Sequence, residues 1–155
     1  MEFSEVTFGS PDYEHTLSLR KRILRDPLRL EWSEEEKAWA ARERHFVLRE
    51  EGRVIGCVVA RDLGENVFKL RQMAVEPKRQ KAGLGRVLLE RVEGLLIGEG
   101  VTGFELNARD LAVGFYEKLG YQRVGDEFVE VSIPHWKMEK VAGDRLVGGG
   151  QEMAR

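Results

Sequence analysis

A short loop with two glycines, set between an apolar stretch and an amphipathic helix, constrains the fold of this chain most. The loop reads Gln80-Lys81-Ala82-Gly83-Leu84-Gly85, which is the pattern Q-x-x-G-x-G. The apolar stretch Met73-Ala74-Val75 and the turn signal Glu76-Pro77 precede it. After it, apolar residues recur with i, i+3, i+4 spacing as far as Leu96, which is typical of a helix with one buried face. The sequence therefore predicts a strand, a glycine loop and a helix N-terminus, in that order.

The start of this helix is suited to an anionic ligand. A helix N-terminus offers free backbone N–H groups and a partial positive charge, and glycine lets a ligand approach the backbone closely. The net charge of the chain is −2, yet cationic residues gather here: Lys78, Arg79, Lys81, Arg86 and Arg91. Two common phosphate loops are excluded. The P-loop pattern is absent, and Leu88 stands where a dinucleotide fingerprint has its third glycine.

A second motif follows the predicted helix. It contains Asn107 and Ala112 and continues as Phe115-Tyr116-Glu117-Lys118-Leu119-Gly120-Tyr121. With the glycine loop, it makes the span from Leu70 to Tyr121 resemble the core of the GNAT superfamily, the acetyl-CoA-dependent N-acyltransferases. The phosphate loop of that family is [QR]-x-x-G-x-[GA], and the second segment looks like its N-x-x-A-x-x-F-Y-x-x-x-G-[FY] motif. The ending Ile133-Pro134-His135-Trp136-Lys137-Met138 resembles the I-P-H-x-x-M ending of a bacterial subgroup.

The resemblance implies a site for acetyl-CoA. The loop from Gln80 to Gly85, with Arg86, is expected to hold the pyrophosphate. The backbone of Met73, Ala74 and Val75 is expected to meet the pantetheine arm, with a backbone N–H near Val75 as the oxyanion donor. Phe115 is expected to pack near the adenine or in the core. Asn107 either bonds the pantetheine or simply ends its strand, and the sequence leaves both interpretations open.

Tyr116 is the candidate general acid, because a phenol with a pKa of about 10 is protonated at neutral pH and can give its proton to a thiolate. Periodicity alone favours a core tyrosine, and the resemblance favours the acid. Some family members carry a glutamate as general base four residues before Met73, but this chain has Lys69 there. The remaining candidates are Glu105, Glu127, Glu130 and His135. The last, with an ordinary pKa of about 6.5, is either a catalytic group or a histidine that begins a strand.

The spacing of the apolar residues predicts an α+β fold with α/β-type layers. It is a mixed, mostly antiparallel central sheet flanked by helices on both faces, in the order βααβββαβαββ. The expected strands are residues 3–8, 45–50, 54–61, 66–75, 103–106, 128–133 and 135–140. Helices are expected from Pro11 to near Asp26, after a Ser33 capping box, from Gly83 to Gly98, and over 111–119 with Asp110 as N-cap. Residues 1–142 are expected to form one domain, and 143–155 a flexible glycine-rich tail.

Composition narrows the class of protein further. The sequence has no apolar run long enough for a membrane span and begins without a secretory signal pattern. Its single cysteine, Cys57, and scattered histidines offer neither an internal disulfide nor a metal site. We therefore expect a cytoplasmic protein that uses no metal and binds neither membrane nor nucleic acid. Proteins of this family are often dimers, so a homodimer is one expectation for the assembly.

Three functions stay open at this point. The first is an N-acetyltransferase that transfers an acetyl group from acetyl-CoA to a primary amine of a small molecule or an amino acid, by direct attack in a ternary complex. The second is an enzyme of the same fold that acetylates a protein N-terminus or lysine. The third is an acyl-CoA-binding module without turnover. The sequence gives almost no indication of the acceptor. Arg25 and Arg29 could meet an acidic acceptor or form a solvated helix face, and Trp32 could line a pocket or the core.

Overall fold

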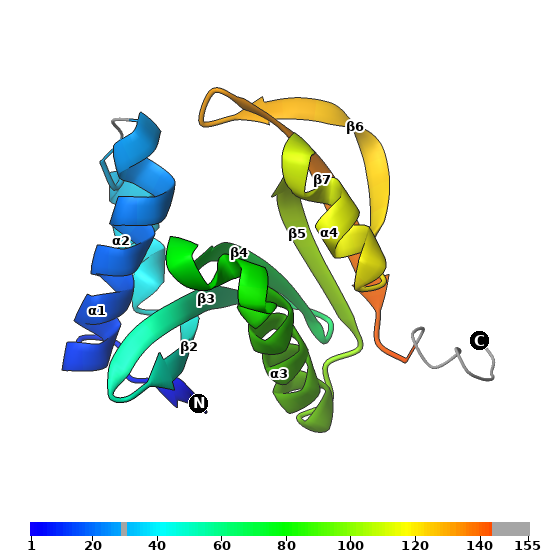
Figure 1. Ribbon diagram of the computed structural model, residues 1–155. Coiled ribbons are helices and arrows are strands. Elements are labelled where there is room, and N and C mark those ends of the chain that lie inside the picture. The colour runs from blue at the N-terminus through cyan, green and yellow to red at the C-terminus, as the bar shows by residue number, and fades with distance from the viewer. Residues whose placement is uncertain (29–30, 144–155) are drawn as a thin grey trace. The chain divides into compact units, whose positions relative to one another are not determined.

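The computed structural model describes residues 1–28 and 31–143, except for the side chains of residues 80–82. Its strands form one seven-stranded sheet in the order β1-β2-β3-β4-β5-β7-β6 (Figure 1). The strands are β1 (Glu2–Val6), β2 (Arg44–Glu50), β3 (Arg53–Gly64), β4 (Val67–Val75), β5 (Gly103–Arg109), β6 (Gln122–Glu130) and β7 (Ile133–Val141). The α-helices are α1 (Pro11–Arg20), α2 (Glu34–Ala40), α3 (Leu84–Gly98) and α4 (Val113–Lys118). Most neighbouring strands are antiparallel and one pair is parallel, so the predicted α+β class and element order are confirmed.

The chain divides into two compact units. The first unit contains residues 1–61 and 70–96, and the second contains 62–69 and the residues from 97 onward. The predicted tail falls mostly on residues 144–155, which lie outside the described residues. The prediction of one domain over 1–142 stays a prediction.

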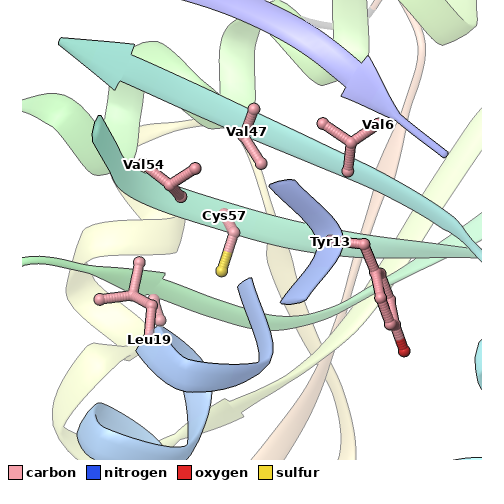
Figure 2. Packing of buried hydrophobic residues seen from close by; sticks show 7 residues of the cluster. Val6, Tyr13, Leu19, Val47, Val54 and Cys57 are labelled. Atoms are coloured by element: carbon pink, nitrogen blue, oxygen red, sulfur yellow. The ribbon is translucent and has the colours of Figure 1, made fainter. Parts of the chain in front are cut away.

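The core of the first unit forms on both faces of its strands. On one face, α1 places Tyr13 and Leu19 against Val47 and Cys57 of the antiparallel pair β2–β3, as Figure 2 shows. The adjacent residue Gly56 points the other way, as successive residues of a strand do. There a Cβ would lie 3.6 Å from the side chains of Leu88 on α3 and Val75 on β4. Helices therefore cover both faces of these strands, as the sequence predicted.

Serines cap the first two helices, and the capping box predicted at Ser33 is confirmed. The Tyr13 N–H donates to Ser10 Oγ at 3.2 Å. At α2, Ser33 and Glu36 form the reciprocal capping box, with the Glu36 N–H donating to Ser33 Oγ at 3.1 Å and the Ser33 N–H donating to Glu36 Oε1 at 2.8 Å. Such caps are worth about 1 kcal/mol each. After α1 the chain continues as a π-helical turn η1 (Lys21–Arg25) and a 3₁₀ turn η2 (Asp26–Leu28), so the predicted end near Asp26 is confirmed.

Strand β4 contributes to both units. Its first three residues pair in parallel with β5, from Val67 opposite Gly103 to Lys69 opposite Glu105, and its later residues belong to the first unit. Gln72, in the middle of the strand, has a φ of 51°. Only a few per cent of non-glycine residues adopt a positive φ, and the left-handed conformation interrupts the pleat at this point.

In the second unit, β5, β7 and β6 form an antiparallel arrangement with β7 in the middle, and the first residues of β4 pair in parallel with β5. The strand predicted at 128–133 is wrong in its bounds: β6 begins at Gln122, and Val131 and Ser132, both with positive φ, form the turn into β7. The prediction missed its first half because most of those side chains are exposed and polar, so no apolar alternation marks it.

The prediction of Asp110 as the N-cap of the helix between β5 and β6 is also wrong. Residues 110–112 form a 3₁₀ turn η4, and Ala112 stands at the N-cap of α4 without a side-chain bond.

The C-terminus of α4 is closed by a Schellman motif. The Tyr121 N–H donates to the Tyr116 carbonyl at 3.1 Å, and the Gly120 N–H donates to the Glu117 carbonyl at 3.1 Å, which is the pair of bonds that defines this motif. Gly120 has the required left-handed φ, 97°. The Lys140 ammonium donates to the Leu119 carbonyl at 2.7 Å and satisfies a further helix-end oxygen.

We expect Gly120→Ala to lower the free energy of unfolding by about 1–3 kcal/mol, because alanine pays a steric cost at positive φ. The new Cβ would also lie 3.2 Å from Lys140 Cε. Gly114→Ala is the matched control. Gly114 lies within α4, and a methyl group added there would meet no atom within 4 Å, so alanine raises stability by about 0.5–1 kcal/mol. Urea unfolding measures the stability of both variants. If both are less stable, or both more stable, than the unmodified chain, the account is contradicted.

We expect Cys57 to be unreactive in the native protein. The residue is 2% exposed, and burial raises the pKa of its thiol to about 12, so the reactive thiolate is nearly absent at neutral pH. A chromogenic disulfide reagent is expected to detect no thiol in native protein at neutral pH, and one thiol per chain in denaturant. Rapid modification of Cys57 in the native protein would show that the core around it opens, and would contradict this prediction.

Candidate active site

The predicted glycine loop takes a compact form in the first unit. A 3₁₀ turn, η3 (Pro77–Ala82), leads to Gly83, and α3 begins at the next residue. Gly83 has a φ of 77° with nothing within 4 Å of where a Cβ would stand. Its carbonyl accepts the Val87 N–H at 3.1 Å, the first bond of the helix. The backbone thus turns sharply into α3 at an open position, and the first N–H groups of a helix have no partner within the helix itself.

Charges around this turn are partly paired. Arg86 is 66% exposed in its side chain and its Nε donates to Glu90 at 3.2 Å, a surface pair that leaves the guanidinium accessible to a ligand. Glu76 accepts two bonds of 3.0 Å from Arg22, and these hold the pKa of its carboxyl below the ordinary value. The side chains of the predicted residues Gln80, Lys81 and Ala82 lie outside the described residues.

The strand segment before the turn has buried side chains. Ala74 and Val75 are 2% and 6% exposed, whereas Met73 is only half-buried. The following N–H, that of Glu76, donates to the Ile55 carbonyl at 2.9 Å and is therefore committed within the fold. The oxyanion donor expected near Val75 stays a prediction.

Tyr116 is held firmly in the second unit. Its ring meets Phe115 edge-on at 5.0 Å and Tyr121 edge-on at 5.9 Å between centroids, and its carbonyl is an anchor of the Schellman motif. Burial raises the pKa of the Tyr116 phenol to about 12. The group is therefore fully protonated at neutral pH and is a proton donor, as a general acid must be. Phe115, 37% exposed, packs on the tyrosine and still presents surface.

Asn107 lies on β5 and is bonded within the unit. Its amide Nδ2 donates to Glu130 Oε1 at 3.1 Å. It precedes Ala112 by five residues, two more than the Asn–Ala spacing of the family motif, so its correspondence to the motif asparagine is looser than that of Tyr116. The amide oxygen is the group that remains to accept a bond from a ligand.

His135, near the start of β7, is 4% exposed and stacks on Phe128 at 5.9 Å. Its Nδ1 lies 2.7 Å from the Ile133 carbonyl. A carbonyl only accepts, so Nδ1 carries the proton and the neutral ring keeps its lone pair on Nε2. Among the other base candidates, Glu105 is paired with Lys137 at 3.3 Å and Glu130 is bonded to Asn107.

The structure thus divides the predicted residues between the units. The glycine turn and Met73–Val75 belong to the first, whereas Asn107, Phe115, Tyr116 and His135 belong to the second. Of the second group, the structure brings Phe115 and Tyr116 into direct contact.

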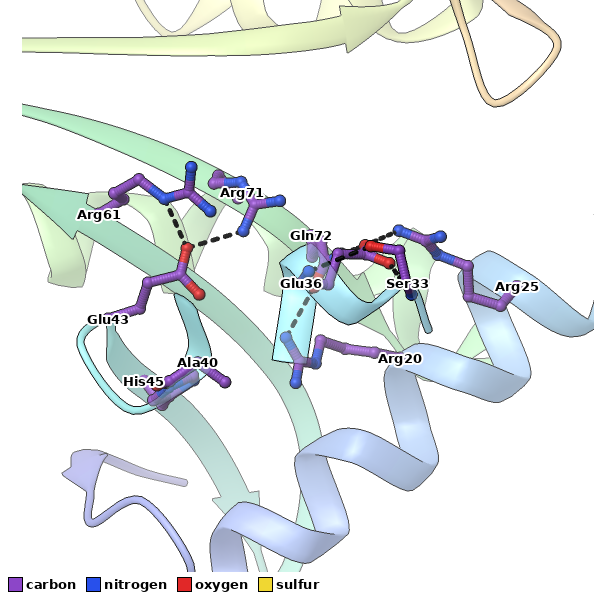
Figure 3. Close-up of polar contacts among 10 residues, drawn as sticks. All are labelled: Arg20, Arg25, Ser33, Glu36, Ala40, Glu43, His45, Arg61, Arg71 and Gln72. Carbon is purple, nitrogen blue, oxygen red and sulfur yellow. Dashed lines mark hydrogen bonds and ion pairs between the residues drawn. The ribbon is translucent and has the colours of Figure 1, made fainter. Parts of the chain in front are cut away.

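A polar cluster in the first unit was not predicted from the sequence, which pointed only to Arg25 among its members. Its residues come from α1, η1, α2, β3, β4 and the residue before β2: Arg20, Arg25, Glu36, Glu43, Arg61, Arg71 and Gln72 (Figure 3). The only signal was a set of charged residues beside apolar strand segments, and pattern alone does not reveal which of them meet.

Neither a metal centre nor a membrane-spanning helix is found in the described part of the chain. In 1–28 and 31–143, no group of three histidine, cysteine, aspartate or glutamate side chains is arranged to hold a metal ion. Nor does any helix of that part combine the length and apolarity needed to cross a membrane.

Comparison with known proteins relates these features to a family. The chain is 34% identical over 96 residues to the uncharacterized protein YyaT of Bacillus subtilis. The aligned residues cover 62% of this chain and 64% of that protein. It is 37% identical over 73 residues to the uncharacterized N-acetyltransferase YjcF of the same organism, covering 46% and 52%. The chain therefore spans less than two thirds of either relative.

A solved structure shares the fold. A GNAT family acetyltransferase from Elizabethkingia anophelis, crystallised with acetyl-CoA bound, superposes with a TM-score of 0.70 over 90% of this chain and 97% of that one, at 16% identity. The sequence model of the acetyltransferase (GNAT) domain matches residues 25–142. That match includes the glycine turn, the strand before it and the segment of Tyr116, and the chain therefore belongs to the GNAT acetyltransferase family.

Proposed function

We propose that this chain is an N-acetyltransferase that moves an acetyl group from acetyl-CoA to a primary amine of a small molecule or an amino acid. The observation that carries the proposal is the left-handed turn at Gly83, which joins an apolar strand to the open start of α3 in a member of this family. The residues fit the cofactor. A Cβ at Gly83 would meet no atom within 4 Å, which suits the approach of a pyrophosphate to the helix N-terminus, and Arg86 supplies an exposed positive charge on the first turn of α3.

The proposed reaction assigns different tasks to the predicted site residues. Acetyl-CoA supplies an activated acyl group as a thioester. The glycine turn and the backbone of Met73–Val75 anchor and orient it, which lowers the entropic part of the barrier. The neutral amine attacks the carbonyl carbon, a C–N bond forms and the C–S bond breaks. The Tyr116 phenol gives its proton to the departing sulfur, and the nitrogen loses a proton to a base.

His135 is our proposed base. Its Nδ1–H bond to the Ile133 carbonyl fixes the tautomer in which Nε2 can accept a proton, directly or through water. Lys69, at the position where some relatives carry a glutamate, cannot take that role while it is charged.

We expect Tyr116→Phe to lower kcat about 100-fold, because general acids of this kind contribute 10²–10⁴-fold. Affinity for acetyl-CoA is expected to stay within about twofold, since the ring and its packing remain. Release of the CoA thiol with a panel of amines measures the rate, and calorimetry measures the affinity. An unchanged kcat would remove Tyr116 from the mechanism.

The assay also tests the function itself. Acetylated product, identified by mass spectrometry with at least one small amine, is the expected result for the unmodified chain. Acetylation of peptides but of no small amine would indicate a protein acceptor instead. Saturable acetyl-CoA binding with no product from any amine or peptide would indicate a binding module.

A further inference from the structure

The cluster missed by the sequence analysis is a concentration of arginines in the first unit. We call it the arginine cluster and define it as Arg20, Arg25, Arg61 and Arg71 with the partners Glu36, Glu43 and Gln72. Glu43 accepts from Arg61 and Arg71 through the same oxygen, at 2.8 Å each. Glu36 bonds to Arg25 and to the Gln72 amide. Figure 3 shows these side chains converging from α1, η1, α2 and the strands.

The cluster carries more positive than negative charge. Four guanidinium groups, which stay protonated in proteins, face two carboxylates. None of the four arginine side chains is widely exposed: Arg25 is 13% exposed, Arg61 and Arg71 are 18% each, and Arg20 is 4% exposed as a residue. Burial of unbalanced charge costs free energy, so a fold that keeps this excess gains from an anion at the same place.

Arg20 is the arginine of the cluster that most clearly lacks a bonded anion. Its Nη1 donates to the neutral Gln72 amide oxygen at 2.7 Å, and its guanidinium lies 5.1 Å from the centre of the Trp32 ring. The Nε atom is buried and has no hydrogen-bond partner. The side chains bonded to Arg20, those of Tyr13 and Gln72, are neutral, and Glu43 acts on it through electrostatic attraction alone. The buried guanidinium is therefore a strong donor without a bonded oxyanion.

The cluster adjoins the segment that we assign to the thioester. Arg71 and Gln72 directly precede Met73–Val75 on β4. In a regular strand these two side chains would point to opposite faces, but the left-handed φ of Gln72 interrupts the alternation, and both reach the segment 36–43. Strained backbone of this kind persists only where its surroundings enforce it and is common at functional sites.

We propose that the arginine cluster binds an anionic group of the acceptor, so that the substrate is a small amine that also carries a carboxylate or a phosphate. This rests on the proposed function. The planar guanidinium fork pairs with both oxyanions through two parallel bonds, and the position of the cluster beside Met73–Val75 delivers the amine end of such a molecule to the same strand.

The test compares matched amines that differ only in the anionic group. The pairs are β-alanine with β-alaninamide, and phosphoethanolamine with ethanolamine. For each compound, kcat/KM is measured with acetyl-CoA, and the shift in melting temperature is measured with CoA present. We expect one acid to exceed its neutral partner at least about tenfold in kcat/KM and to raise the melting temperature more, since hydrogen bonds to charged groups are worth about tenfold or more in affinity. The pair that shows the preference identifies carboxylate or phosphate.

Variants connect the preference to the cluster. Arg71→Gln and Arg25→Gln are expected to reduce the preference about tenfold, and both keep the carboxylates bonded, because Arg61 still holds Glu43 and Gln72 still holds Glu36. Arg53→Gln is the charge-matched control. It lies in the same unit, outside the cluster, with a side chain 77% exposed, and is expected to keep the preference. Circular dichroism confirms that each variant is folded.

The outcomes separate this inference from the proposed function. Equal use and equal melting shifts for every acid and its neutral partner, or no shift with any of them at millimolar concentration, would overturn the inference, even if neutral amines are acetylated. A preference that survives in both cluster variants would overturn it as well. A melting shift that is specific for an acid and lost in the variants, without turnover, would support the anion site and count against the acetyltransferase.

Discussion

The rest of the structure depends on strand β4, which has different structural roles at its beginning and at its end. Its first three residues form the parallel ladder with β5 and belong with it to the second unit. Its later residues lie in the core of the first unit, where Ala74 joins the cluster around Cys57. Between the two parts, Gln72 adopts a left-handed φ. The glycine turn and α3 follow directly, so one strand sets the position of the arginine cluster, the segment Met73–Val75 and the start of α3.

In the second unit, the C-terminus of α4 fixes the position of Tyr116. The Schellman bonds at the end of α4, the Lys140 ammonium on the Leu119 carbonyl and the ring contacts with Phe115 and Tyr121 all act on or beside the tyrosine. Each is a modest interaction, but together they fix a phenol whose pKa burial has raised to about 12. A proton donor used at neutral pH needs both properties, namely a fixed position and a retained proton.

Local sequence signals predicted what local interactions determine. The Ser33 capping box and the glycine turn before α3 are confirmed because each depends on residues within a few positions of one another. The family resemblance is confirmed for the same reason, since its motifs are contiguous. The predictions that failed lacked such a signal: β6 begins in a polar, exposed stretch, and Asp110 belongs to a 3₁₀ turn rather than to the helix cap.

The arginine cluster could not be predicted because its contacts join distant parts of the chain. Arg20 and Gln72 are 52 residues apart, and Glu43 and Arg71 are 28 apart. In the sequence, Glu34–Glu36 is sufficiently explained as the first turn of a helix and Arg25 as a solvated face. Only the fold shows that these groups meet. The proposed acceptor site depends on such long-range contacts, whereas the proposed cofactor site follows from a contiguous motif, and this explains why the sequence indicated acetyl-CoA and left the acceptor open.

The central claim is that the turn at Gly83 binds acetyl-CoA, and calorimetric titration of the full chain tests it most directly. We expect saturable binding of one acetyl-CoA per chain. Gly83→Asp is expected to weaken it at least about tenfold, because the substitution strains a backbone at positive φ and sets a negative charge against a pyrophosphate. Gly94→Asp, which makes the same change at an exposed position of α3 with open space around it, is expected to bind like the unmodified chain. No heat with acetyl-CoA at millimolar concentration, or full affinity in Gly83→Asp, would contradict the account.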